Sequence, residues 1–372
     1  MNKLGKFTRS QGFMSFLASL VSVICGLVFG YVLLLIFNSE MAGYGLRQML
    51  TAGASSPSRF AKVLYQAAPL LMTGLSVGFA FKTGLFNIGA SGQYTVGAVC
   101  ALICAIGFQA PWWICLLAAM LGGAAWGFFP GFFKAVFNVN EVITSIMFNW
   151  IGLFFVNLLV ANIPNMLASA WGDSQNDRTA SLMKANPEAI IPKQGLDVMM
   201  DSNYMNISIF IAIAFAVLMY IILSKTTFGY ELRACGLNRS ASVYAGINAR
   251  RNIILSMVIS GALAGVGGGL YYLAGTGQFT LGKVLPAMGF NGIPVALLAI
   301  SNPIATIFSA IFVSYIQVGG DAMQPEFTKE IIDMIIAVII YLAAFSLLMK
   351  TVLMNAFSRI GHKNAGKEEA DK

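Results

Sequence analysis

The chain has few charged residues for its length. Of its 372 residues, 10% are Asp, Glu, Lys or Arg, whereas an ordinary soluble domain carries about 25%. So small a supply cannot cover the surface of a water-soluble globule of this size, and 58% of the residues are hydrophobic. The composition therefore excludes a soluble enzyme, a nucleic-acid-binding protein and a disordered chain.

Groups that carry catalysis or bind metals are also scarce. The only histidine is His362, and the five cysteines form no CxxC pair or metal-ligand spacing. The sequence contains no P-loop, HExxH or GxSxG motif. We therefore predict no catalytic residue, no metal site, no cofactor and no ATPase activity of its own. The cysteines are expected to serve as small hydrophobic side chains.

Buried charges for ion coupling are missing as well. Only Glu141 and Asp333 touch the long apolar runs, and both stand at the ends of runs. A proton-coupled pump needs acids and bases inside the membrane, and a membrane enzyme needs buried catalytic groups. The energy for any transport must then come from an ion gradient through uncharged sites, from a partner, or not at all.

What the sequence does contain is long apolar runs. A helix needs about 20 apolar residues to cross about 30 Å of hydrocarbon. We therefore predict an all-α polytopic protein embedded in the lipid of the cell membrane, with about ten transmembrane helices. The runs are 13–37, 63–81, 86–107, 112–133, 142–163, 207–224, 252–273, 285–301, 304–319 and 331–349. The runs 285–301 and 304–319 are short, and Pro286 and Pro294 interrupt the first of them. The region 285–319 therefore forms either two full spans or a partly re-entrant pair.

The basic residues indicate an orientation. The first run follows Lys3, Lys6 and Arg9 and lacks a small-residue cleavage site, which favours an uncleaved span over a signal peptide. Alternating ten spans from a cytoplasmic N-terminus places 15 of the 23 Lys and Arg on the inner side. We predict cytoplasmic termini, one transmembrane domain over residues 1–350 and a cytoplasmic tail over residues 351–372.

Two polar segments interrupt the apolar pattern. Residues 164–206 are predicted to form a long outer loop, and residues 225–251 the longest inner loop. The inner loop mixes apolar and basic residues at helical spacing, which indicates one or two short amphipathic helices broken at Gly236 and Gly246. The simpler interpretation is a solvated, positively charged tether.

Uncharged polar residues inside the runs are the remaining functional signal. Burying an unpaired amide costs a few kcal/mol, so each one faces either a partner helix or a water-filled path. For most of them contact between helices is the simpler interpretation. Phe86, Asn87 and Gln93 combine a ring with two amides, which suits an uncharged, ring-bearing solute. The other candidates for the solute path are Thr144, Asn149 and Asn291.

A faint internal repeat is also present. Residues 91–97 reappear in similar form as residues 276–282, about half the chain later. In the ten-span prediction the two halves would have opposite orientation, as in transporters with inverted repeats. Seven loosely matching residues support this only weakly.

Four motifs resemble those of a known family. The segments are Thr83–Gln93 (TGLFNIGASGQ), Asn140–Thr144 followed by Asn149, Leu232–Asn238 (LRACGLN) followed by Tyr244–Ile247, and Gly289–Leu298 (GFNGIPVALL). Together and in this order they resemble the permease subunits of ATP-binding-cassette (ABC) importers of the branched-chain amino acid, ribose and nucleoside type. The resemblance is nearest to the nucleoside or guanosine permeases and extends over essentially the whole chain.

The resemblance implies a ten-helix permease that works with cytoplasmic ABC ATPases, a second permease chain (a copy or a relative) and an extracytoplasmic substrate-binding lipoprotein. It gives the 225–251 loop the role of a coupling segment that docks on the ATPase. The residues that the resemblance assigns to coupling are Glu231, Leu232, Arg233, Ala234, Gly236, Asn238, Tyr244 and Gly246.

The chain departs from the family pattern at four positions. Ser91 stands where Glu is usual, Arg239 replaces Pro, Pro294 replaces Ala and Ala299 replaces Gly. These departures leave the solute and the docking geometry open. The alternatives are a simple-sugar permease of the ribose type and, less favoured, a stand-alone secondary transporter or channel.

Overall fold

In the part of the chain that the structure describes, residues 11–345 and 351, the computed structural model is all-α. Its only β contacts there are two isolated bridges, Leu167–Thr179 and Arg178–Thr280. The α-helices are α2 (Gln11–Phe37), α3 (Ala42–Thr51), α4 (Pro57–Lys82), α5 (Ala90–Leu102), α6 (Trp112–Phe137), α7 (Glu141–Asn162), α8 (Leu182–Ala185), α9 (Leu196–Met199), α10 (Ser208–Lys225), α11 (Thr227–Leu237), α12 (Arg239–Tyr244), α13 (Ala249–Tyr272), α14 (Ala287–Leu298), α15 (Pro303–Asp321) and α16 (Lys329–Ala344). Short 3-10 or π turns lie at η1 (Ala52–Ala54), η2 (Ile103–Gly107), η3 (Ala168–Trp171) and η4 (Pro187–Ala189). The all-α prediction is confirmed.

The chain divides into two compact units. Residues 53–315 form the larger unit, and the described residues 11–52 and 316–345 belong to the smaller one. In the described part of the smaller unit, α2 packs on α16, where a Cβ on Gly26 would lie 2.9 Å from the backbone oxygen of Ile339. The helix α3, which the sequence analysis did not predict, packs on α2.

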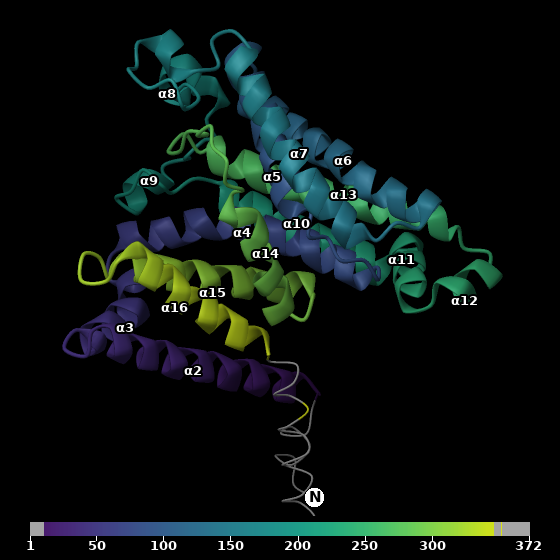
Figure 1. Ribbon diagram of the computed structural model, residues 1–372, viewed down its shortest axis with the longest axis horizontal. Helices are drawn as coiled ribbons and strands as arrows, with labels where there is room; N and C mark the ends of the chain where they lie inside the picture. The colour runs from purple at the N-terminus through teal and green to yellow at the C-terminus, as the bar shows by residue number, and fades with distance from the viewer. Residues whose placement is uncertain (1–10, 346–350, 352–372) are drawn as a thin grey trace, which may run out of the picture. The chain divides into compact units, whose positions relative to one another are not determined.

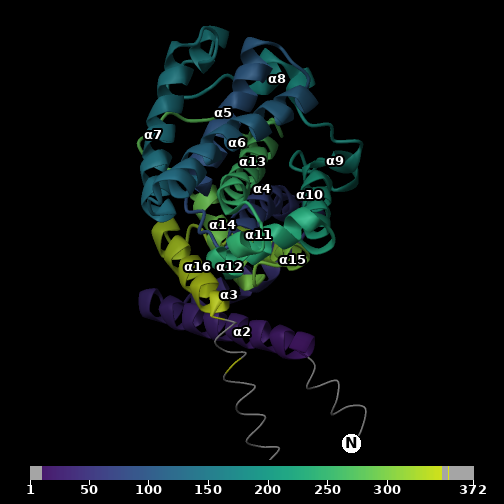
Figure 2. The same ribbon diagram turned by 90° about the vertical axis from the view of Figure 1, so that its right-hand side faces the viewer.

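Helix α13 occupies the centre of the larger unit and packs on α4, α5 and α6 (Figures 1 and 2). Glycines allow these backbones to approach closely. A Cβ on Gly127 of α6 would lie 3.0 Å from the Cα of Gly261 in α13, and Gly97 and Gly123 meet Gly265 at least as closely. Such contacts are typical of helices packed in a membrane, where small residues replace hydrophobic burial as the means of close association.

The helices of the larger unit differ in what surrounds them. Over its apolar stretch α4 is 89% buried, whereas α6 is 22% buried and α7 and α10 are 33% buried. The exposed side chains of α6, α7 and α10 are largely Phe, Leu, Ile and Trp. An apolar outer surface around a buried, Ser- and Thr-containing helix is the arrangement expected of a bundle in lipid.

Eight helices in the described residues are long and apolar enough to cross a membrane. They correspond to predicted runs one to seven and nine. The eighth run, predicted over 285–301, contains only the 12-residue α14, and the tenth ends as described helix at Ala344, with residues 346–350 outside the described part. The predicted tail also lies outside it, except for Thr351.

The two polar segments lie at opposite ends of the larger unit, with α8 and α9 at one end and α11 and α12 at the other (Figure 1). Residues 164–206 are fastened by long-range bonds. The Thr179 amide donates to the Phe279 oxygen (2.8 Å), and the Asn186 side chain donates to Ala105 (2.9 Å) and Ala110 (3.1 Å). The long loop is therefore an ordered cover on the bundle.

The two copies of the faint repeat have different structures. Residues 91–97 lie inside α5, whereas residues 276–282 form a non-helical segment that pairs with residues 177–179. The similarity between residues 91–97 and 276–282 therefore does not correspond to a structural repeat.

Candidate functional site

The first candidate site begins at the end of α4. Helix α4 ends in a Schellman turn: Leu85 N–H bonds the Ala80 oxygen (2.9 Å), Gly84 N–H bonds the Phe81 oxygen (3.1 Å), and Gly84 has φ +76°. The chain then runs without helical structure to Gly89, where α5 begins. This turn places the Phe86 and Asn87 side chains against the bundle interior.

Asn87 and Gln93 form a reciprocal amide pair. The Asn87 Nδ2 donates to Gln93 Oε1 (2.7 Å), and the Gln93 Nε2 donates to Asn87 Oδ1 (3.1 Å). Asn87 Nδ2 also donates to the Ser76 hydroxyl (3.1 Å). Asn87 is 0% and Gln93 1% exposed, so the pair is closed off from solvent. We call Asn87, Gln93, Ser76 and Asn149 the amide network.

Asn149 of α7 caps the start of α5 from another helix. Its Oδ1 accepts from Gly92 N–H (2.8 Å) and its Nδ2 donates to the Ile88 oxygen (3.1 Å). The first N–H groups of a helix have no partner within the helix, and Asn149 supplies one. Its role in this structure is therefore to hold α7 and α5 together.

Glycine 89 lets polar side chains gather at this point. A Cβ there would lie 3.1 Å from Asn87 Oδ1, 3.2 Å from Gln93 Nε2 and 3.2 Å from the Ser145 hydroxyl. The Ser145 hydroxyl is buried and has no hydrogen-bond partner among the described residues. A buried unpaired hydroxyl is costly, so Ser145 is the polar group at this point whose hydrogen bonding the described residues do not satisfy.

The other predicted path residues lie outside the amide network. Phe86 is half-buried and stacks on Phe81, with ring centroids 4.8 Å apart. Thr144 donates to the Asn140 oxygen one turn earlier in α7 (3.0 Å). Asn291 is half-buried in α14.

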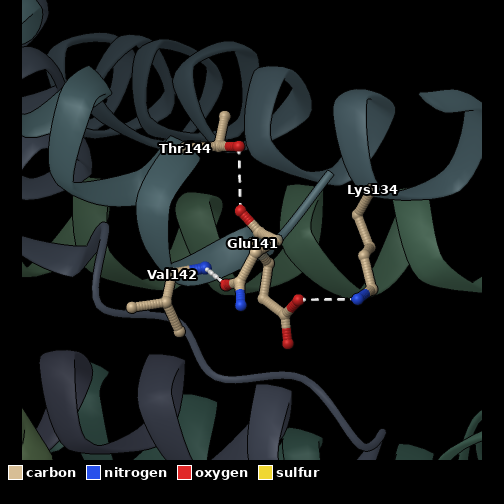
Figure 3. A network of polar contacts seen from close by, with 5 residues as sticks. Lys134, Glu141, Val142 and Thr144 are labelled. Atoms are coloured by element: carbon tan, nitrogen blue, oxygen red, sulfur yellow. Dashed lines mark hydrogen bonds and ion pairs between the residues drawn. The ribbon is translucent and has the colours of Figure 1, made fainter. Parts of the chain in front are cut away.

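Beside Thr144, the turn between α6 and α7 carries an ion pair. Lys134 Nζ lies 2.9 Å from Glu141 Oε2, and the Asn140 side chain caps α7 by accepting from Val142 N–H (2.8 Å) (Figure 3). Glu141 therefore closes a turn and is not an isolated charge within the membrane.

Ser76 is not among the residues predicted from the sequence. It lies on one face of α4 with Thr73 and Thr83, at the spacing i, i+3, i+10, and the Ser260 hydroxyl donates to its backbone oxygen (2.9 Å). Small hydroxyl residues repeating on one face of an apolar helix are the signal that identifies such a buried polar stripe.

The second candidate site is the α11–α12 hairpin (residues 227–244). The predicted break at Gly236 is wrong by two residues: α11 continues to Leu237, and the extended Asn238 (φ −154°) separates the helices. The Asn238 side-chain oxygen accepts a hydrogen bond from Ala241 N–H (3.0 Å) and so caps the start of α12. This cap, and not Gly236, sets the boundary between the two helices. The predicted second break is confirmed at Gly246 (φ +84°).

A groove of about 560 Å³ runs along the hairpin. Its exposed walls are mostly apolar, and its polar members include Thr227, Glu231, Asn238 and Ser242. The lining residues are Thr227, Tyr230, Glu231, Ala234, Leu237, Asn238, Ala241, Ser242, Ala245 and Ile247. Leu237 in this lining is 89% exposed and the nearby Tyr244 is 94% exposed, so the hairpin presents large apolar side chains at one end of the bundle.

The predicted coupling residues serve in two ways. Leu232 is fully buried, Glu231 accepts from the Asn252 amide (3.3 Å), and Gly236 packs against the α4 turn. These residues attach the hairpin to the bundle. Arg233, which donates to the Gly229 oxygen (3.4 Å), and Tyr244 are exposed, and Ala234 lines the groove.

These features define a multi-pass membrane protein with an enclosed polar network and an exposed helical hairpin that carries an apolar groove. A family described as "Branched-chain amino acid transport system / permease component" matches residues 59–344. The chain belongs to this family of permease components, and the resemblance seen in the four motifs is confirmed. Membership implies that ATP hydrolysis is left to a separate ATPase and that a substrate-binding partner takes part.

Three curated relatives illustrate the similarity. The chain is 34% identical to the nucleoside ABC transporter permease protein NupB of Lactococcus lactis, over 96% of this chain and 98% of the relative. It is 34% identical to the guanosine ABC transporter permease protein NupP of Bacillus subtilis, over 91% and 95%. NupQ, a guanosine ABC transporter permease protein of the same organism, is 28% identical over 68% and 79%. No solved structure matches the chain significantly.

Proposed function

We propose that the chain is the permease subunit of an ATP-driven importer for nucleosides or a related uncharged, ring-bearing solute. The observation that carries the proposal is the 34% identity to nucleoside and guanosine permeases over more than nine-tenths of the chain. The amides of Asn87 and Gln93 near the Phe86 ring offer donors, acceptors and a stacking surface of the kind a nucleoside requires.

The proposed topology has ten spans with both termini in the cytoplasm. The hairpin then faces the cytoplasm and residues 164–206 face outward, which agrees with their location at opposite ends of the larger unit (Figure 1). Helix α14, with 12 residues, extends only about 18 Å. It therefore crosses the membrane only together with the non-helical segment before it, as a broken span.

An inverted repeat is proposed on different residues from the heptapeptide. Both α5 and α14 begin after a non-helical segment, and their first turns meet: a Cβ on Gly289 would lie 2.8 Å from the Ser91 Cβ, and the Ser91 hydroxyl bonds the Pro286 oxygen (3.0 Å). Paired short helices meeting inside a bundle are a feature of transporters built from inverted repeats.

The proposed partners each have a surface. The ABC ATPase docks on the groove of the α11–α12 hairpin, whose exposed aromatic and aliphatic side chains suit a protein interface. The extracytoplasmic lipoprotein docks over residues 164–206. The second permease is a related chain, because the Bacillus subtilis relatives include two guanosine permeases, NupP and NupQ.

The proposed solute path passes Phe86, Asn87, Gln93, Thr144, Asn149 and Asn291. In the present conformation the Asn87 and Gln93 amides are paired with each other, and Asn149 bonds backbone groups of Gly92 and Ile88. Solute passage exchanges the bonds of the amide pair for bonds to the solute. The competing interpretation is that the amides only join helices. It predicts that uptake recovers in a variant that combines Asn87→Leu with Gln93→Leu, whereas the solute path predicts that uptake stays low.

The proposal is tested by transport in proteoliposomes. The permease is reconstituted with its cognate ATPase, second permease and binding protein, and uptake of labelled guanosine, cytidine, ribose and glucose is measured with and without ATP. We expect ATP-dependent uptake of nucleosides that excess unlabelled sugar does not inhibit. Uptake of ribose or glucose alone would establish the sugar permease instead, and uptake without the ATPase would establish a secondary transporter or channel.

A further inference from the structure

The hairpin and the α4 turn meet through two glycines. A Cβ on Gly84 would lie 2.5 Å from the Gly236 Cα, and a Cβ on Gly236 would lie 2.7 Å from the Gly84 nitrogen. The backbones are therefore in direct contact, with no side chain between them to absorb a displacement. Two observations favour glycine at position 84: the close approach of Gly236 leaves no space for a Cβ, and the φ of +76° lies in the left-handed region.

Helix α11 is held firmly at this contact. Leu232 is 0% exposed, and the Asn252 amide of α13 donates to Glu231 Oε2 (3.3 Å) and Cys235 Sγ (3.7 Å). On the other side of the contact, the Thr83 hydroxyl bonds the Ser256 hydroxyl of α13. Closely packed groups of this kind transmit displacement instead of deforming continuously.

Only two residues, Leu85 and Phe86, separate Gly84 from Asn87 of the amide network. The turn at Gly84 is closed by its two Schellman bonds, Leu85 is 5% exposed, and Phe86 stacks on Phe81. The next residue is Asn87, which pairs with Gln93. A shift of the turn therefore reaches the Asn87 side chain along a short, buried and bonded segment.

We propose that Gly84 and Gly236 form a positioning pair that transmits movement of the α11–α12 hairpin to the Asn87–Gln93 amide pair. The inference rests on the proposed function, because it needs an ATPase that moves the hairpin. It adds the route: inward displacement of α11 presses the α4 turn and separates the two amides, and outward displacement lets them pair again.

The test is Gly236→Ala in the reconstituted complex, because the added methyl group pushes α11 away from the turn. We expect the variant to bind the ATPase and hydrolyse ATP, while guanosine transported per ATP hydrolysed falls at least tenfold. The matched control is Gly43→Ala, where a Cβ meets nothing within 4 Å, and it keeps the wild-type ratio. A Gly236→Ala complex with the wild-type ratio overturns the inference.

A second variant decides the matter if Gly236→Ala does not assemble. Asn252→Ala removes the bonds that hold α11 to α13 but leaves both glycines unchanged. We expect a ratio three- to tenfold below wild type, and a ratio within twofold of wild type overturns the inference. Failure of the proposed function looks different: the wild-type complex itself then shows no ATP-dependent uptake or binds no ATPase.

Discussion

The amide network and the α11–α12 hairpin differ in whether their side chains have contact partners within the protein. The side chains of Asn87, Gln93 and Asn149 are at most 1% exposed, and each has a hydrogen-bond partner. The hairpin leaves Tyr244 and Leu237 almost fully exposed beside an apolar groove. A closed polar network needs a change of conformation before it can meet a solute, whereas an open apolar groove needs only a partner.

The largest expected effect comes from reversing a charge on the hairpin. Arg233→Glu changes the electrostatics of the exposed surface that we propose as the ATPase docking site without touching the core, so the protein should still insert into the membrane. We expect uptake to be abolished and the ATPase to be lost on co-purification.

The matched control for this charge reversal is Arg59→Glu, an exposed arginine at the start of α4. It should retain uptake and ATPase binding. Normal uptake and normal ATPase co-purification with Arg233→Glu would show that this residue has no part in coupling.

The amide network is tested by comparing one substitution with two. Asn87→Leu strands the Gln93 amide and should destabilise the protein by about 1–3 kcal/mol and lower uptake. Adding Gln93→Leu removes the stranded partner, so thermal stability in detergent should recover. We expect uptake to stay low in the double variant.

Recovery of uptake together with stability would contradict the solute-path assignment. It would show that the two amides only join helices. The double variant thus separates the two interpretations of the same hydrogen bonds, which the single substitution alone does not.

An intermediate effect is expected at Tyr244. Its side chain is 94% exposed, so Tyr244→Ala should leave thermal stability unchanged. Removing an aromatic anchor from a protein interface typically costs about 2 kcal/mol, or roughly thirtyfold in affinity, measured here as ATPase binding to the solubilised permease. The comparison variant is Tyr341→Ala, another exposed tyrosine, and equal effects of the two would argue against a specific interface.

The smallest expected effect is at the α6–α7 turn. The Lys134–Glu141 pair is partly exposed, with side-chain exposures of 25% and 15%, so Glu141→Gln should cost about 1 kcal/mol or less and weaken further with salt. A double-variant cycle with Lys134→Met isolates the pair energy. A loss of uptake much greater than the loss of stability would instead give Glu141 a role in transport.

Much of the fold was predictable because it depends on local composition. In the described residues, long apolar runs predicted the eight helices that are long enough to cross a membrane. The mixed 225–251 segment predicted one or two short helices, and two are present. Helix α3 was not predictable in this way, because its ten residues mix polar and apolar side chains and contain no long apolar run. The break at Asn238 was misplaced because a side-chain cap outweighs a nearby glycine.

The candidate site was predictable only as a set of residue types. The sequence identified Asn87, Gln93 and Asn149 as polar groups that need partners, but not which partners. Asn149 caps a helix more than 50 residues away in the chain, and Ser76 enters the network from α4. Such pairings depend on how helices pack, which no local pattern specifies.

By itself the sequence determined the class of protein. Too little charge to cover a soluble surface, long apolar runs and four family motifs established an all-α membrane permease component. Only the tertiary structure decided that Asn87 pairs with Gln93 and that Gly84 touches Gly236. The physical reason is that burial in lipid follows from composition, whereas a hydrogen bond or a backbone contact requires two distant segments to reach one place.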